Sequence, residues 1–273
     1  MGSDTGLFGP DSVTWRVHGE PVLFVGGLRA LLLQALHPLA MAGVAEHSRY
    51  REDPWGRLRR TADYVGTVTF GSRADVDAAV ARVRAVHRTV TGVDLVTGQP
   101  YRADDPELLR WVHCCEVDSF LTTARRIGLL DPDEADAYVA EQARAGRLVG
   151  VPDRLLPRSA ADLASYFDGV RPQLRRTPAA VRGLGFLLLP PMPARVALLT
   201  PARPAWAGIA ALAFALLPRW ARRMYGMPGL PTTDLGATAA VFSLRTALRA
   251  LPEEWRQGPH LRAARARITA GAG

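Results

Sequence analysis

The chain has 273 residues, which is enough for one large domain or two small ones with a sizeable hydrophobic core. Hydrophobic residues make up 48% of the sequence and charged residues 22%, a balance that excludes a disordered chain. The net charge of +8 comes from arginine, because the sequence contains no lysine. The arginines are scattered from Arg16 to Arg267 rather than gathered with aromatic residues, so we expect no nucleic-acid partner.

Two cysteines, Cys114 and Cys115, are adjacent in the sequence. Neighbouring cysteines rarely form a disulfide because the geometry is strained, so no disulfide framework is expected. The first ten residues contain no basic stretch followed by an apolar run, which is the pattern of a secretory signal. Together these features predict a reduced protein in the cytoplasm.

The most apolar segment runs from Trp206 to Leu217 and is shorter than the ~20 residues that a membrane-spanning helix needs. Arg219, Arg222 and Arg223 follow it directly. A buried core helix with a basic end fits this pattern, and so does a helix that touches a membrane surface. Peripheral contact with a membrane therefore stays open as an alternative.

Helical periodicity dominates the sequence, and the alternation typical of strands is nearly absent. The first helical region runs from Val22 to His47, and Pro38 is expected to kink or split it. Later helices open on a capping residue, usually with proline at the first helical position: Asp53–Pro54, Ser72 with Asp75, Asp105–Pro106 and Asp131–Pro132. Gly92 and Gly128 are expected to end two of them.

A loop or short hairpin carrying Gly98 and Pro100 separates two of these helices. Proline-punctuated apolar helices complete the chain, with no repeat and no low-complexity linker. The sequence therefore predicts one all-α globular domain of about nine or ten helices.

One histidine lies on the predicted buried face of the helix that begins at Arg73. That face is marked by apolar residues at helical spacing: Val76, Val80, Val83, Val86 and Val90. His87 falls on the same face, and Arg84 precedes it by one turn. A buried imidazole needs a carboxylate, a backbone carbonyl or a metal as its partner.

Two further histidines, His113 and His37, are expected to be deeply placed. His113 lies within the apolar stripe of the helix after Asp105, and His37 and His47 belong to the first helical region. The sequence has no HExxH or CxxC zinc pattern and no ExxH pair for a di-iron site. Each histidine alone fits a structural role, but several inward histidines in a helical domain favour haem, which helical folds bind through an axial histidine.

The segment RLRRT, residues 57–61, is a basic cluster. Arg57, Thr61 and Tyr64 follow one side of a helix, and Arg60 lies beside that row. A solvated basic face is one interpretation. A site that holds carboxylates, such as haem propionates, through charge-assisted hydrogen bonds is the other.

Four segments occur in an order and at intervals that resemble the MpaB-type oxygenase family, which also contains the catalytic domain of the latex-clearing proteins, or rubber oxygenases. They are LQALHPLAMAGVAEHS, DPWGRLRRTADYV, RVRAVHRTVTG and LLRWVHCCEVDSF. The resemblance covers about Leu7 to Leu251. It implies a single oxygenase domain over residues 1–273, with a haem b pocket between the helices.

The resemblance also implies roles for individual residues. His87 matches the proximal iron ligand, and Arg84 matches the arginine one turn before it. Arg57, Arg60 and Thr61 match residues on the distal side of the haem, and His113 matches a second histidine near it. By the same resemblance, the rubber oxygenases have a lysine at the position of Arg60. A guanidinium is a poor iron ligand, so we do not expect this side chain to bind the iron on the distal side.

These features predict a haem b-dependent oxygenase in which histidine-ligated iron activates dioxygen and the substrate is an isoprenoid, lipid or other alkene-bearing small molecule. Arg60 and Thr61 would donate hydrogen bonds to bound oxygen or to propionates. His37 and Glu46 would serve acid–base roles in the pocket. The alternatives are a haem-binding sensor or carrier without turnover, and a haem-free lipid-binding module that uses the apolar segments after Val181.

Overall fold

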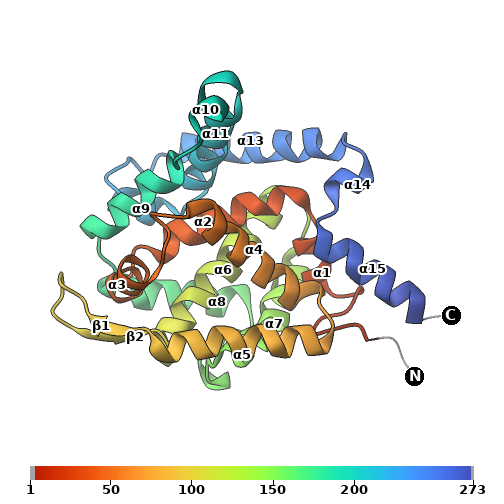
Figure 1. Cartoon of the computed structure of the whole chain (residues 1–273), viewed down its shortest axis with the longest axis horizontal. Coiled ribbons are helices and arrows are strands. Elements are labelled where there is room, and N and C mark those ends of the chain that lie inside the picture. The colour runs from red at the N-terminus through yellow and green to blue at the C-terminus, as the bar shows by residue number, and fades with distance from the viewer. Residues whose placement is uncertain (1–3, 272–273) are drawn as a thin grey trace.

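The core of the protein forms where helix α2 (Phe24–Gln34) lies along helix α6 (Pro106–Arg126) in a computed structural model that describes residues 4–271 (Figure 1). The two helices approach closely at Gly26, where a Cβ atom would lie only 3.0 Å from Thr123 Oγ1 and 3.1 Å from Phe120 Cδ1. Buried Arg29 then ties them together. Its guanidinium donates to Ser119 Oγ at 2.6 Å and pairs with Asp118 at 2.8 Å.

Residues 4–271 form fifteen α-helices and one small two-stranded sheet. The remaining elements in chain order are α1 (Val13–His18), α3 (Pro38–His47), α4 (Pro54–Phe70), α5 (Arg73–Thr89), β1 (Thr91–Val93), β2 (Pro100–Arg102), α7 (Pro132–Val149), α8 (Ala160–Val170), α9 (Pro178–Leu188), α10 (Ala194–Leu199), α11 (Ala202–Ala215), α12 (Arg219–Met224), α13 (Pro231–Arg249), α14 (Glu253–Arg256) and α15 (Pro259–Gly271). Three 3₁₀ turns, Pro21–Leu23, Asp153–Leu155 and Arg171–Gln173, connect them. The all-α prediction is confirmed, but the predicted count of nine or ten helices was too low. Prolines divide the second half of the chain into more and shorter helices than periodicity alone indicates.

The predicted helix starts are confirmed because they depend on local chemistry. The carboxylate of Asp53 accepts from the backbone N–H of Gly56 at the start of α4. Ser72 and Asp75 form the expected capping box of α5. Pro38 splits the first helical region, and the two parts, Pro21–Gln34 and Pro38–His47, meet at 105°.

Two details of α5 differ from the prediction. The helix ends at Thr89 instead of Gly92, because Thr91–Val93 pairs with Pro100–Arg102 as an antiparallel hairpin. Val86 was expected to be buried, yet 55% of it is exposed. Successive helical residues point about 100° apart, so a helix that turns His87 inward turns Val86 outward.

The helices form layers around the core. In Figure 1, α5 runs along one side of the fold, whereas α9, α10, α11 and α13 lie at the opposite side, with α2, α4 and α6 between them. No single helix of the described chain is both long and apolar enough to cross a membrane, and only the bent pair α2–α3 passes that test jointly.

Candidate functional site

His87 lies in the last turn of α5 and is half-buried. Its Nδ1 atom is sealed from solvent and has no hydrogen-bond partner within residues 4–271. Burial, and then the positive charge of Arg57, lowers the pKa of His87 below its ordinary value. The lowered pKa favours the neutral imidazole, which is the form that binds metals.

Arg57 is the cation whose charge acts on this histidine. It is partly buried on α4, and burial, followed by the charge of Arg60, lowers the pKa of its guanidinium. No carboxylate of the described chain forms an ion pair with it. Buried charges are normally paired or neutralised, so an unpaired guanidinium in this position favours the binding of an anionic group.

Arg57 also borders an apolar pocket of about 150 Å³. The walls come from α2, α3, α4, α6, α9 and α11, and most of the side chains in them are aliphatic or aromatic: Leu31, Leu32, Met41, Val44, Leu58, Val112, Leu184, Phe186, Leu187 and Trp206. The polar groups at its edge are Arg57, Gln34 and Tyr50. A largely apolar lining with a few polar groups at its edge is the composition of sites that bind hydrophobic small molecules.

Two tryptophans fix the rim of this pocket. Trp206 donates from Nε1 to the carbonyl oxygen of Leu187 at 2.8 Å, and Trp55 donates to that of Pro191 at 2.9 Å. Their rings meet edge to face, with centroids 4.7 Å apart. The start of α4 is thereby joined to the end of α9 and to α11.

The other members of the RLRRT segment face different surroundings. The side chain of Arg60 is 56% exposed and forms an ion pair with Asp53 at 3.1 Å. The hydroxyl of Thr61 donates to the backbone carbonyl of Arg57, one turn earlier. Of the predicted distal residues, only Arg57 therefore combines burial with an unused hydrogen-bonding group.

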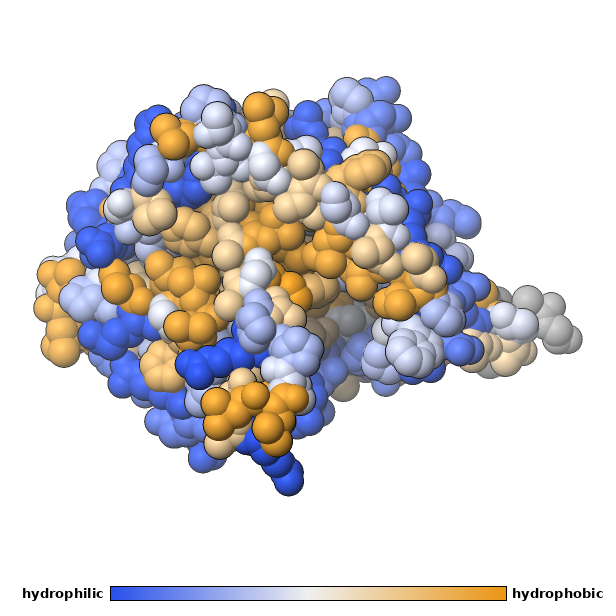
Figure 2. Space-filling view, turned by 90° about the horizontal axis from the view of Figure 1, so that it is seen from above, coloured by the Kyte–Doolittle hydropathy of each residue, from blue (hydrophilic) through white to orange (hydrophobic). Residues whose placement is uncertain are grey.

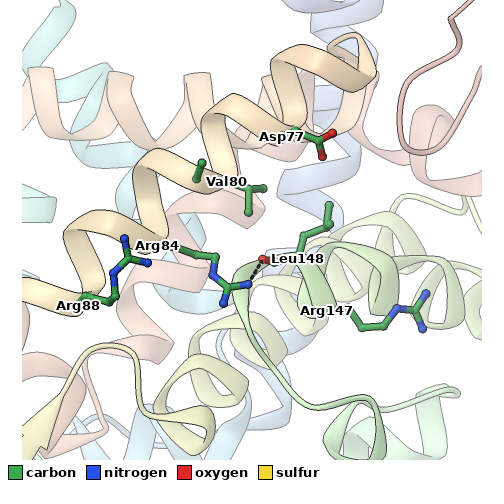
Figure 3. Close-up of a pocket in the computed structure, with 7 residues that line it drawn as sticks. Asp77, Val80, Arg84, Arg88, Arg147 and Leu148 are labelled. Atoms are coloured by element: carbon green, nitrogen blue, oxygen red, sulfur yellow. Dashed lines mark hydrogen bonds between the residues drawn. The ribbon is translucent and has the colours of Figure 1, made fainter.

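Arg84 points to a second groove, between α5 and α7. Figure 3 shows it reaching toward Leu148, to whose carbonyl oxygen it donates at 3.3 Å. Arg88 and Arg147 line the same open groove of about 420 Å³, and Arg147 extends away toward Asp153. The match of Arg84 to the family's arginine beside the proximal ligand stays a prediction.

His113 is buried between α6 and α7. Its Nε2 atom faces Gly146, where a Cβ atom would lie 3.0 Å away. Burial lowers the pKa of His113 to about 4, so the ring is neutral. The structure thus places this histidine inside the protein, as the sequence predicted.

His37 and Glu46 lie at opposite ends of α3. His37 is the buried N-cap residue, its Nδ1 has no partner in the described chain, and its ring lies 5.8 Å from that of Trp111. Glu46 is exposed and accepts a hydrogen bond of 2.5 Å from the hydroxyl of Tyr101. Nine residues of helix separate the two by about 13 Å, so they cannot serve one reacting atom.

The sequence matches one known protein family over most of its length. Residues 15–251 match the family described as ER-bound oxygenase mpaB/B′/rubber oxygenase, catalytic domain. The chain belongs to this oxygenase family. No curated protein and no solved structure matched the chain.

Membership of the mpaB/rubber oxygenase family supports an oxygenase activity. The matched range contains α3 to α6 and hence every predicted site residue, including His87 and Arg57. Within residues 4–271, no group of three or more His, Cys, Asp or Glu side chains could hold a metal ion.

Sequence reasoning assigned no role to Glu116, which is the most unusual acid near this site. Burial raises its pKa to about 7. Burial, and then the charge of Glu116, raises the pKa of Tyr64 on α4 and of Tyr138 on α7, so the carboxylate lies near both. The one signal in the sequence is a charged residue directly after two cysteines in an apolar run.

Proposed function

We propose that the protein is a haem b-dependent oxygenase of a hydrophobic small molecule, in which His87 would bind the haem iron. The observation that carries this proposal is the pair formed by His87 and Arg57. The charge of Arg57, which has no ion pair within residues 4–271, acts on the imidazole of His87, whose Nδ1 has no hydrogen bond there, and Arg57 also lines an apolar pocket. The oxygenase family supplies the class of reaction.

The residues present suit haem better than a metal bound by the protein alone. Haem carries the equatorial nitrogen ligands of its iron and needs one imidazole from the protein. His87 is neutral because it is buried, so its lone pair is available to iron at neutral pH. Arg57 would hold an anionic group, such as a haem propionate or reduced oxygen, through charge-assisted hydrogen bonds.

Bound haem would supply the activation of dioxygen. The aliphatic walls of the pocket would hold the substrate and exclude water, which suits an isoprenoid, a lipid or another alkene-bearing molecule. His37 lies between two residues of the pocket wall, Ala35 and Ala40, and its free Nδ1 can accept a proton there. It is better suited to an acid–base role than Glu46, whose carboxylate is bound to Tyr101.

The first test is a hemin titration of the full chain, followed by Soret absorbance. We expect about one haem per wild-type chain and a shifted, weakened band for His87→Gly, because one axial histidine holds the iron. Added imidazole should restore the wild-type spectrum of that variant. His47→Gly is the matched control, since His47 also ends a helix but bonds Tyr101, and it should behave as wild type.

A folded wild-type chain that takes up no haem would contradict the proposal. So would a His87→Gly spectrum identical to that of wild type. Substrate-dependent dioxygen consumption with a panel of alkenes and lipids separates the oxygenase from a haem sensor or carrier, which would bind haem but consume none.

A further inference from the structure

The segment from Gly169 to Thr233 contains no acidic residue at all. It contains nine arginines, and three of them form ion pairs with acids outside the segment: Arg171 with Asp168, and Arg219 and Arg222 with Asp234. The other six are exposed and have no ion pair within residues 4–271: Arg175, Arg176, Arg182, Arg195, Arg203 and Arg223. This segment, which builds α9 to α12, therefore carries a strong excess of exposed positive charge.

Exposed large apolar side chains alternate with these arginines along the segment. Leu198 and Leu199 at the end of α10 are 80% and 82% exposed, and Leu189 before that helix is also exposed. In Figure 1, α10 projects from the top of the fold. Figure 2, which views this face from above, shows hydrophobic residues gathered across its centre with hydrophilic ones around them. Adjacent exposed leucines of this kind mark an interaction site.

We propose that the α9–α11 face docks on the surface of an anionic lipid bilayer. Arg195 precedes the two leucines by one turn of α10, and Arg203 follows Leu199 by four residues. The leucines would enter the boundary of the acyl chains while the arginines reach lipid phosphates, which is the arrangement of an interfacial helix. This contact differs from the one the sequence indicated, because Arg222 is buried and donates to Asp234 and to the carbonyl oxygen of Leu217.

Two other occupants, a second copy of the chain and a nucleic acid, fit this face less well than a bilayer does. A symmetric dimer would place the same positive patch of both copies opposite itself, and like charges repel. A nucleic acid would satisfy the arginines but would leave Leu198 and Leu199 without an apolar partner. An anionic bilayer satisfies both the charges and the leucines.

The same face borders the apolar pocket. Leu184, Phe186 and Leu187 of α9 and Trp206 of α11 line the pocket and flank α10 on either side in the sequence. A hydrophobic molecule dissolved in the bilayer would reach the pocket through this face. This route, unlike the docking itself, rests on the proposed oxygenase function.

The test is flotation of the full chain with vesicles of phosphatidylcholine alone or with phosphatidylglycerol added. We expect binding to the anionic vesicles, at least tenfold weaker binding to the neutral ones, and release at about 1 M salt, where charges are screened within about 3 Å. Leu198→Ser/Leu199→Ser and Arg195→Ala/Arg203→Ala should each weaken binding at least tenfold. These residues are exposed, so circular dichroism should report an unchanged fold.

Matched controls lie elsewhere on the surface. Leu95 in the hairpin loop is 91% exposed, and Leu95→Ser should leave vesicle binding unchanged. Arg82→Ala/Arg154→Ala removes two exposed, unpaired arginines outside this face and should have no effect either. Equal losses in controls and test variants would mean that net charge alone causes binding, and would overturn the assignment of this face.

Two other outcomes would also overturn the proposal. One is wild-type binding by the Leu198→Ser/Leu199→Ser variant. The other is a chain that ignores vesicles but self-associates, with association lost in that variant, which would assign the face to a second copy. Hemin uptake, measured on the same samples, separates this test from that of the oxygenase: failed uptake with intact vesicle binding would remove the substrate route only.

Discussion

Gly146 of α7 faces the imidazole of His113 on α6 so closely that a Cβ atom would lie 3.0 Å from Nε2 and 2.5 Å from a methyl group of Leu156. Glycine inside a helix is normally unfavourable by roughly 1 kcal/mol relative to alanine. Here it lets a buried histidine fit between two helices. Residue 146 therefore sets the position of His113.

Gly146→Ala is expected to destabilise the protein by about 1–3 kcal/mol in urea unfolding, because Leu156 and His113 must move in a packed interior. Gly208→Ala is the control. It lies within α11 with open space around its Cα, so alanine should be neutral there or stabilise by up to about 1 kcal/mol. Equal stability of Gly146→Ala and wild type would mean that His113 is not held by this contact.

Glu116 predicts a specific dependence of stability on pH. Its folded pKa of about 7 exceeds the ordinary value of 4.5, so the folded state binds the proton more tightly than the unfolded state. The contribution of this group to the free energy of unfolding should therefore be greatest below about pH 4.5 and should fall as pH rises to about 7, by on the order of 3 kcal/mol in total. Glu116→Gln should abolish that fall.

Urea unfolding of both proteins between about pH 5 and pH 8 measures the effect. The variant should be more stable than wild type at the upper end, and the two should converge at the lower end. Glu107→Gln on the same helix replaces an exposed carboxylate and should leave the pH profile unchanged. Parallel profiles of wild type and Glu116→Gln would show that the carboxylate is solvated.

Arg57 is expected to lower stability while it serves the site. Arg57→Met removes a partly buried, unpaired charge, so the free energy of unfolding should stay the same or rise, by on the order of 1 kcal/mol. Hemin affinity and substrate-dependent dioxygen consumption should fall at least tenfold. Arg59→Met on the same helix replaces an exposed arginine with no predicted role and should change none of these quantities. Lower stability together with unchanged hemin affinity in Arg57→Met would assign Arg57 a structural role.

Arg29, unlike Arg57, is expected to stabilise the protein, because its buried guanidinium has hydrogen-bond and ion-pair partners. It donates to the carbonyl oxygen of Leu216 and to Ser119, and pairs with Asp118. Arg29→Met should cost about 3–5 kcal/mol, since it leaves these partners unsatisfied in the core. Thermal or urea unfolding checks this value, and Arg125→Met in the last turn of α6, outside this network, is a suitable comparison.

The parts of the fold that sequence predicted correctly depend on neighbouring residues. Asp53 caps α4 and Ser72 caps α5 through groups three residues away, so each start can be inferred from a short segment. Pro38 splits the first helical region for the same reason. The path of the chain after Pro178 depends instead on contacts between distant helices, and there the predicted helices were too few.

In the candidate site, too, some positions follow from local spacing in the sequence and others depend on contacts with distant residues. The half-buried position of His87 follows from its spacing to Val76 and Val80, which are both buried. The exposed position of Arg60 depends on a pairing with Asp53 across two turns, and periodicity does not specify it. The surroundings of Glu116 depend on Tyr138 of α7, which no local pattern connects to it.

The paired indoles of Trp55 and Trp206 are the two of the six tryptophans that report on the pocket. Trp206 lines the cavity, and the Trp55 ring lies 4.7 Å from it, so any molecule that enters changes the polarity around a natural fluorophore. A porphyrin nearby would quench the emission of both rings by energy transfer, whereas a colourless lipid would shift its wavelength. Cofactor loading and ligand entry can thus be followed as separate events in unlabelled protein.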